Sequence, residues 1–303
     1  MKPRTLRKLY TARRYVTTAI LFAFFFTVCI VFILPTVLTF TNSLMSKSEI
    51  AANYGQIFQS VAGDAKTYVS GETNLKLIPD MVTFSQYENV LLRNPQYLFK
   101  FWNSVILSVP IVLFQLGVAV LAAYGFARFS GKLRSLVFFV YVILMLMPYQ
   151  VTLVPNYLVS GWLGILNTPF AVILPGIFSP FAVYILTKFM RRIPVAMFEA
   201  AKLDGAGEWQ IFTRICLPMS GGILYSVAIL IFIDYWNMVE QPLVLLSDTA
   251  MHPLSVFLSQ INAGDAALAF AVASIYMVIP LLTFLYSEEH IIEGVAYAGG
   301  VKG

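Results

Sequence analysis

The ionisable side chains of this chain do not group into a catalytic or metal-binding set. Its two histidines, His252 and His290, stand alone without the spacing that zinc ligands require. No phosphate loop of the form GxxxxGK[ST] is present, so we expect no nucleotide to bind in that way. No serine, histidine and carboxylate are placed to form a nucleophilic triad. We therefore expect no catalytic residue, no metal ligand and no cofactor bound by the chain itself.

One carboxylate is unusual because of its surroundings. Asp234 is the only acid inside a long apolar stretch, and it lies toward the end of that stretch that we place outside the cell. Intramembrane acids are costly, and proton-driven carriers depend on chains of them. A self-sufficient ion-coupled pump is therefore disfavoured, and a transporter of this composition would need a partner to supply energy.

The composition is that of an integral membrane protein. Hydrophobic residues make up 59% of the chain and charged residues only 12%, with a mean hydropathy of +0.78. Soluble domains carry about 25% charged residues. Cys29 and Cys216 lie in or beside apolar stretches, so no disulfide framework is expected. The net charge of +5 is interpreted as a signal of membrane topology.

The apolar stretches predict the number of spans. A helix needs about 20 apolar residues to cross the hydrocarbon core. The first stretch is longer than the roughly 7–15 apolar residues of a cleavable signal peptide, so we interpret it as a retained span. We predict an all-α integral membrane fold with six transmembrane helices, at about residues 15–40, 102–126, 135–158, 169–187, 218–237 and 266–286.

Proline is frequent inside these stretches. Each such proline removes a backbone hydrogen bond and kinks its helix. This is compatible with ordinary membrane helices, and also with a bundle of bent helices that lines a path and can rearrange. The residues concerned are Pro35, Pro110, Pro148, Pro155, Pro175, Pro180 and Pro280.

Lysine and arginine set the expected orientation. They concentrate in the N-terminal tail, in the second–third loop and in the fourth–fifth loop, whereas the third–fourth and fifth–sixth loops contain none. Because basic loops stay in the cytoplasm, both termini are predicted to be cytoplasmic. Trp102, Trp162 and Trp236 then fall near outer ends of spans, as an interfacial aromatic belt would.

This topology divides the chain into five parts. Residues 41–98 form a long extracellular segment, in which Thr83 and Gln86 have the spacing of a capping box and predict a short helix near 84–92. The full division is a basic cytoplasmic tail at 1–14, the first span at 15–40, the extracellular segment at 41–98, a five-span core at 99–287 and a cytoplasmic tail at 288–303.

The cytoplasmic loop at about 188–217 is helix-prone and contains a glycine bend. Pro194 can occupy the first position of a helix that continues through residues 195–203. Gly205 and Gly207 would end that helix. We predict two short helices joined by the bend, lying against the membrane surface.

Two further details of this loop are predicted from residue types. Asp204 can cap the second short helix, on which Trp209 and Phe212 share a face.

Phe198 and Ala201 would form a small apolar face suited to docking, with Glu199 and Lys202 beside it. The alternative is a solvated interfacial helix in which Glu199 merely pairs with Lys202.

The spacing of the loop residues resembles a known signature. Glu199-Ala200-Ala201, three residues, Gly205, nine residues and then Ile215-x-Leu217-Pro218 is similar to the EAA signature of ABC importer permeases. The run Asp204-Gly205-Ala206 follows the carbohydrate-uptake variant, and the end Gly299-Gly300-Val301-Lys302-Gly303 resembles that of maltose-permease G-type subunits. The resemblance covers about residues 80–303 and the first span.

The resemblance implies a fold and an assembly. Residues 99–287 would form a type I ABC importer permease core in the bacterial plasma membrane. The chain would pair with a second homologous permease, two copies of a cytoplasmic ATPase that uses ATP and Mg²⁺, and an extracellular solute-binding protein. It would not itself be an enzyme. The residues that would couple it to the ATPase are Glu199, Ala200, Ala201, Asp204, Gly205 and Ala206.

A sugar is the cargo that the resemblance implies, and polar and aromatic groups along the path would suit its hydroxyls and ring faces. The same side chains could instead form interhelical hydrogen bonds, worth about 0.6 kcal/mol each. The candidates are Asn103, Gln115, Asp234, Tyr235, Trp236 and Asn237, with Tyr124, Gln150 and Tyr184 as further possibilities.

Two alternatives remain open. The same architecture could import glycerol phosphate or a polyamine, although a phosphate would favour Arg or Lys in the path and the apolar stretches contain none. A stand-alone carrier or channel would leave the loop at Glu199 without a role.

Overall fold

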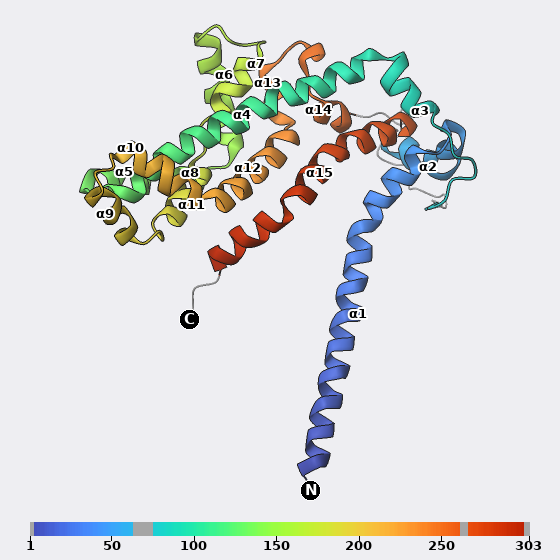
Figure 1. Ribbon diagram of the computed structural model, residues 1–303. Coiled ribbons are helices and arrows are strands. Elements are labelled where there is room, and N and C mark those ends of the chain that lie inside the picture. The colour runs from blue at the N-terminus through green and yellow to red at the C-terminus, as the bar shows by residue number, and fades with distance from the viewer. Residues whose placement is uncertain (1–2, 63–74, 261–265, 300–303) are drawn as a thin grey trace. The chain divides into compact units, whose positions relative to one another are not determined.

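The computed structural model describes residues 3–62, 75–260 and 266–299, with side chains described for residues 15–54, 75–260 and 266–287. The described residues form helices and turns without a β-strand (Figure 1), which confirms the all-α prediction. Only helices and closed barrels satisfy every backbone group within lipid. The α-helices are α1 (Pro3–Ser43), α2 (Lys47–Ala62), α3 (Ser85–Glu88), α4 (Pro95–Arg128), α5 (Lys132–Met145), α6 (Tyr149–Trp162), α7 (Pro169–Gly176), α8 (Pro180–Met190), α9 (Val195–Leu203), α10 (Glu208–Ile211), α11 (Leu217–Met219), α12 (Gly221–Trp236), α13 (Glu240–Leu245), α14 (Leu254–Ser259) and α15 (Ala266–Gly299). Two π-helices, η1 (Asn89–Arg93) and η2 (Phe212–Cys216), and a 3-10 helix, η3 (Thr249–Met251), complete the set.

Within the described residues, four helical segments are long and apolar enough to cross a membrane, and two bent helix pairs raise the total to six if each pair is one span. The four segments coincide with the first, second, fourth and sixth predicted stretches. They are Tyr15–Ser43, Pro95–Arg128, Pro169–Met190 and Ala266–Ser287.

The third predicted stretch, 135–158, is not one continuous helix. It is divided into α5 and α6, which are bent by 104° relative to each other. Pro148 sits at the break as the N-cap of α6, with a φ of −64°. Proline cannot donate a backbone hydrogen bond, and it disfavours helical geometry at the preceding residue, Met147. The kink expected from this proline is therefore a full break of the helix.

The fifth stretch, 218–237, is also interrupted. Residues Glu208–Met219 and the helix α12 are bent by 73°. Ser220 lies at the bend, with φ −91° and ψ 5°. The continuous apolar part of this span therefore begins at Gly221.

The chain divides into two compact units. Unit 1 comprises Met1–Arg93 with Ile261–Ser274, and unit 2 comprises Asn94–Gln260 with Ile275–Gly303. In unit 1, apolar side chains from the turn after α1, from α2 and from the start of α15 form a small core. Its members are Met45, Ile50, Tyr54, Ala266 and Ala267, with Phe270 packed against them.

The short helix predicted near 84–92 is present, but its predicted cap is wrong. Residues 85–93 form α3 and η1. The N-cap is Phe84, and the Thr83 hydroxyl accepts a hydrogen bond from the amide of Ser85 at 3.2 Å. The Gln86 side chain is buried and its Oε1 makes no hydrogen bond to any described residue. The helix therefore begins one residue later than a capping box on Thr83 requires.

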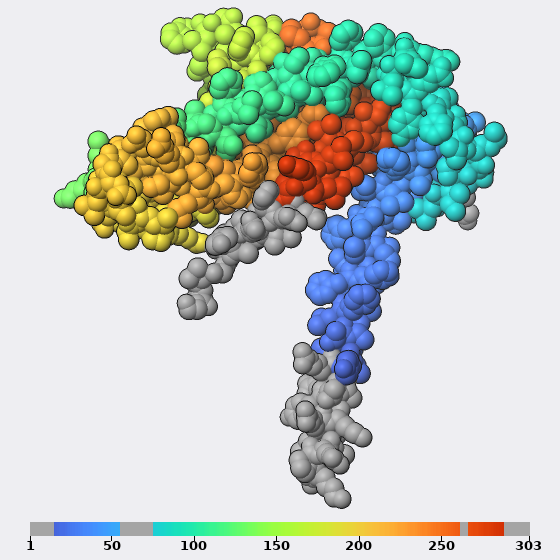
Figure 2. Space-filling view, viewed as in Figure 1, coloured from blue at the N-terminus to red at the C-terminus, as the bar shows by residue number. Residues whose placement is uncertain are grey.

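Unit 2 is built around α4, which packs against α5, α7, α8, α12 and α14. Near its start, the Ser104 hydroxyl accepts a hydrogen bond from the amide of Leu254 at 2.9 Å. Its other end lies beside the group formed by α9, α10 and α11 (Figures 1 and 2), where Tyr124 bonds Glu208 and the Arg128 guanidinium lies over the Phe198 ring. Because α4 runs between these two contacts, it connects the loop of α9 and α10 to the opposite end of unit 2.

Candidate functional site

The first helix of the loop ends in a Schellman motif, the common left-handed helix terminus. Gly205 has a φ of +80°. Its amide donates to the Lys202 carbonyl at 3.0 Å, and the Ala206 amide donates to the Ala201 carbonyl at 2.9 Å. Ala201 and Ala206 both pack against the main core of unit 2. Because only glycine adopts this φ without cost, the motif explains why glycine stands at position 205.

The second helix is capped differently from the prediction. Asp204 is the C-cap of α9, not the N-cap of α10. The N-cap of α10 is Gly207, whose amide donates to the Gln210 Oε1 at 3.0 Å. The predicted shared face of Trp209 and Phe212 is confirmed, with ring centroids 5.3 Å apart. The two short helices and the glycine bend are therefore present, and only the cap was misassigned.

Glu208 links the loop of α9 and α10 to α4 through two side-chain contacts. One carboxylate oxygen of Glu208, Oε1, lies 2.6 Å from the Lys202 Nζ, and the other, Oε2, accepts a hydrogen bond from the Tyr124 hydroxyl at 2.7 Å. The alternative pairing of Lys202 with Glu199 is therefore not formed. Sequence spacing alone could not identify this bridge, since Tyr124 and Glu208 are 84 positions apart.

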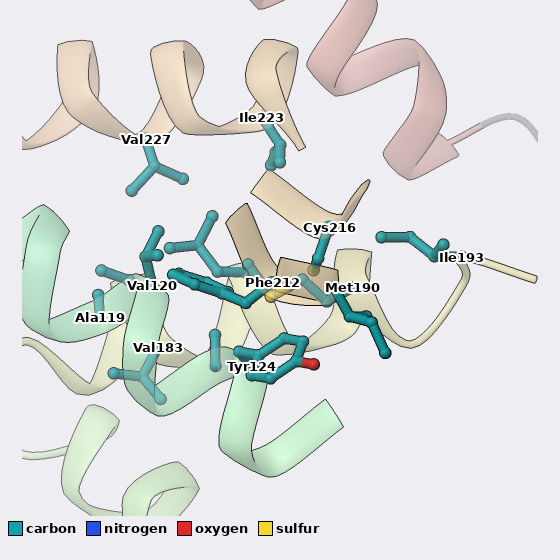
Figure 3. Packing of buried hydrophobic residues seen from close by; sticks show 14 of the residues in the cluster. Ala119, Val120, Tyr124, Val183, Met190, Ile193, Phe212, Cys216, Ile223 and Val227 are labelled. Atoms are coloured by element: carbon teal, nitrogen blue, oxygen red, sulfur yellow. The ribbon is translucent and has the colours of Figure 1, made fainter. Parts of the chain in front are cut away.

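Phe198 was expected on an exposed docking face, and this prediction is wrong. Its side chain is 2% exposed, and the Arg128 guanidinium lies 4.0 Å above its ring. It belongs to a core to which α4, α8, η2 and α12 contribute, as Figure 3 shows for Tyr124, Met190 and Phe212 among others. Phe198 therefore holds α9 against the core of unit 2.

This burial leads to a stability prediction. We expect Phe198→Ala to lower the free energy of unfolding by about 3–5 kcal/mol, as removal of a buried aromatic side chain usually does. Leu203→Ala, at the end of the same helix, is the matched control, because Leu203 is 90% exposed. The two variants are compared by thermal unfolding in detergent. Equal, small shifts for both would show that Phe198 is not buried.

The outward surface of α9 and α10 combines a free carboxylate with large apolar side chains. Glu199 and Ala200 are exposed, and Glu199 has no ion pair within the described part of the chain. Leu203 and Trp209 are 90% and 67% exposed. Val195 is exposed as well. Exposed apolar patches mark sites of interaction with proteins or with the membrane.

Two of the predicted path residues are enclosed in the core of unit 2. Gln115 is 2% exposed, and its Oε1 makes no hydrogen bond to the described residues. Trp236 is 1% exposed, so it belongs neither to an open path nor to an interfacial belt in this conformation. Its ring packs against those of Phe101, Phe232 and Tyr276, with centroids 5.8, 5.3 and 5.4 Å away.

Two further candidates for the substrate path form hydrogen bonds between helical segments. The Asn103 amide donates to the carbonyls of Ala250 and His252, at 2.7 and 3.2 Å. The Tyr235 hydroxyl donates to the Gly176 carbonyl at 3.3 Å, joining α12 to α7. These contacts agree with the alternative in which polar groups form interhelical hydrogen bonds.

Asp234 and Asn237 remain as exposed polar groups at the end of α12. The Asn237 Oδ1 accepts a hydrogen bond from the Tyr276 hydroxyl at 3.0 Å, whereas Asp234 makes no hydrogen bond or ion pair to another described residue.

Gln150 is exposed and donates to Glu240 Oε2 at 3.2 Å. Sequence reasoning missed Glu240, because it lies beyond the apolar stretch that drew attention to its neighbours.

The bent spans around α4, together with the loop at its end, form the fold of an ABC importer permease. The chain is similar to a chain of the crystal structure of a bacterial ABC transporter involved in the import of the acidic polysaccharide alginate. The TM-score is 0.71 at 21% identity, covering 95% of this chain and 98% of that chain. Residues 115–288 match the model of the binding-protein-dependent transport system inner membrane component, and the chain belongs to this family.

Curated relatives share most of their length with this chain. The arabinooligosaccharides transport system permease protein AraQ of Halalkalibacterium halodurans is 31% identical, over 74% of this chain and 81% of its own length. The lactose transport system permease protein LacG of Rhizobium radiobacter is 29% identical, over 67% and 74%. The osmoprotective compounds uptake permease protein GgtD of Synechocystis is 33% identical, over 67% and 70%.

Proposed function

We propose that this chain is the membrane-spanning permease subunit of an ATP-driven importer for a sugar, and specifically an oligosaccharide. The observation that carries the proposal is the loop of α9 and α10, which is fixed to α4 and presents Glu199, Leu203 and Trp209 outward. The names of AraQ and LacG, both sugar permeases, support the choice of cargo.

Such a subunit requires partners. We infer a second homologous permease, two copies of a cytoplasmic ABC ATPase and an extracellular solute-binding protein, with ATP and Mg²⁺ used by the ATPase and not by this chain. The alginate transporter was crystallised in complex with a periplasmic protein bound to an alginate pentasaccharide, which supports the last of these. The chain would reside in the bacterial inner membrane with both termini in the cytoplasm.

Coupling would proceed through the loop. In this proposal α9 and α10 bind the ATPase through their outward surface, and closure of the ATPases displaces them. The Glu208 bridge to Tyr124 passes that displacement to α4, because its two bonds join Lys202 of α9 to the end of that span. Alternating access then results if the two arrangements bind the ATPase with different affinity.

Asp234 and Asn237 are the side chains of this subunit that we propose for contact with the cargo. Both are exposed at the end of α12, and a carboxylate and an amide can bond sugar hydroxyls. The apolar stretches contain no lysine or arginine, so a phosphorylated cargo would lack a cationic partner on this subunit.

The test is ATPase stimulation of the assembly in lipid nanodiscs, with its binding protein present. Arabino- and malto-oligosaccharides and lactose are compared with glycerol phosphate and spermidine. We expect one or more of the sugars to raise the rate of ATP hydrolysis. Stimulation by glycerol phosphate or spermidine alone would contradict the sugar cargo while leaving the importer class intact. Uptake into vesicles that contain this chain without an ATPase would contradict the importer class.

A further inference from the structure

Unit 1 carries an unusually apolar surface outside its long helix. Eight large apolar side chains between residues 75 and 92 are 45–78% exposed. Large apolar side chains exposed together mark sites of interaction with proteins or with the membrane. We call these residues the 75–92 patch; its members are Leu75, Leu77, Ile78, Met81, Val82, Phe84, Leu91 and Leu92.

The patch is attached to the end of α1. The amide of Thr83, between Val82 and Phe84, donates to the Leu44 carbonyl at 2.9 Å. Four residues further on, the Tyr87 hydroxyl lies 2.6 Å from the hydroxyl of Ser43, the last residue of α1. These two contacts place the middle of the patch beside the point where α1 ends.

The length of α1 locates that point relative to a membrane. Its apolar part, Tyr15–Ser43, has 29 residues, and none of its most apolar window is buried inside the protein. At about 1.5 Å per residue this part is about 43 Å long. A bilayer is about 30 Å thick in its hydrocarbon core and about 40–45 Å with the headgroups. When α1 crosses the membrane, Leu44 therefore lies in the headgroup layer.

The charged side chains near the patch are paired with one another. Lys76 lies 3.3 Å from Glu49 and also pairs with Asp80, while Arg93 lies 2.9 Å from Glu88. The hydrogen bonds that Lys76 donates to Asp80 and to Glu49 raise the pKa of Lys76. The segment thus offers an apolar surface whose charges are paired among themselves, which suits the apolar side of a lipid headgroup layer better than a partner steered by charge.

We propose that the 75–92 patch inserts into the headgroup layer of the membrane at the end of α1 and anchors unit 1 to the lipid surface. Its occupant is lipid, because the patch continues the lipid-exposed surface of α1 at the depth where hydrocarbon gives way to headgroups. The inference does not depend on the cargo or on the ATPase.

The collision rates of a spin label with oxygen and with a nickel chelate test whether the 75–92 patch lies in the headgroup layer. Oxygen concentrates in lipid and a nickel–diamine diacetate chelate stays in water. The assembly is placed in nanodiscs, reactive cysteines of partner subunits are replaced, and a nitroxide is attached to Val82→Cys or Met81→Cys in a Cys29→Ser background. Both sites are exposed, so a label is tolerated. The natural Cys29, exposed on α1, provides the hydrocarbon reference, and free nitroxide in buffer provides the aqueous one.

We expect the labels at positions 81 and 82 to collide more with oxygen than with the nickel chelate, at a depth shallower than that of Cys29. More collisions with the chelate than with oxygen would overturn the proposal, because the patch would then lie in water. Low collision rates with both reagents would overturn it as well, since the patch would then be covered by a protein partner.

Discussion

Gly205→Pro is expected to abolish transport while the chain still inserts into the membrane. Proline fixes φ near −65°, whereas Gly205 requires +80°. Proline also lacks the amide that bonds the Lys202 carbonyl at 3.0 Å. The combined cost is on the order of 3 kcal/mol, about a 100-fold shift of the equilibrium between the formed and the unwound loop. The measurement is cargo uptake, normalised to the amount of chain in the membrane.

Three milder substitutions distinguish the effect of the backbone conformation at Gly205 from the effect of steric crowding by a side chain. A Cβ at Gly205 or at Gly207 would have no neighbour within 4 Å, but Gly207 has a φ of −72°. Gly205→Ala should therefore reduce transport more than Gly207→Ala, which we expect to resemble the wild type. Gly205→Asn should retain most activity, because asparagine tolerates the left-handed conformation. Normal transport by stably expressed Gly205→Pro would refute the coupling role of the loop.

Glu199→Arg is the second substitution with a large expected effect. Glu199 is exposed and has no ion pair within the described residues, so reversing its charge should change the fold stability by no more than about 0.5 kcal/mol. At an interface, a like-charge juxtaposition costs several kcal/mol. We therefore expect the ATPase to be lost from the purified assembly and transport to fall by more than about tenfold, equivalent to 1.4 kcal/mol.

Glu199→Gln is the matched control, because it removes the charge and keeps the shape. It should give an intermediate loss, with the melting temperature of the chain unchanged in both variants. If the Arg variant retains both its ATPase and its transport, Glu199 is a solvated surface residue and the interface lies elsewhere. If the melting temperature of a variant falls, its loss of transport results from reduced stability of the fold.

Hydropathy alone predicted the spans that are straight, since long apolar stretches carry their own signal. Hydropathy did not predict that the helix breaks fully at Pro148. A proline in an apolar stretch indicates a kink. The size of the bend between α5 and α6, 104°, depends on the elements against which these two helices pack. The same limit applies to the fifth stretch, where the bend falls at Ser220.

The side of a short helix that faces the core was not predictable in α9. Val195, Met197 and Phe198 are all apolar, so residue type does not show which of the three faces the core. The structure buries Phe198 because Arg128, 70 positions away in the sequence, covers its ring. Asp204 was misassigned as an N-cap for a related reason, since the left-handed turn at Gly205 makes it the end of α9.

Trp236 shows how long-range packing limits the prediction of a binding path. A tryptophan near the end of a span fits both an interfacial belt and a sugar platform. Its burial depends on Phe101 in α4 and Tyr276 in α15, which cannot be located relative to it from local sequence. Asp234, in contrast, was identified from its apolar surroundings and is exposed.

We propose that this chain works as a permease subunit joined to an ATPase through the loop at Glu199. The deciding experiment is purification of the tagged chain from native membranes in mild detergent, followed by mass spectrometry of the proteins that accompany it. We predict recovery of a second permease and a nucleotide-binding ATPase, and loss of the ATPase from Glu199→Arg. Recovery of the chain alone or as a homo-oligomer, under conditions that preserve other complexes, would contradict the claim.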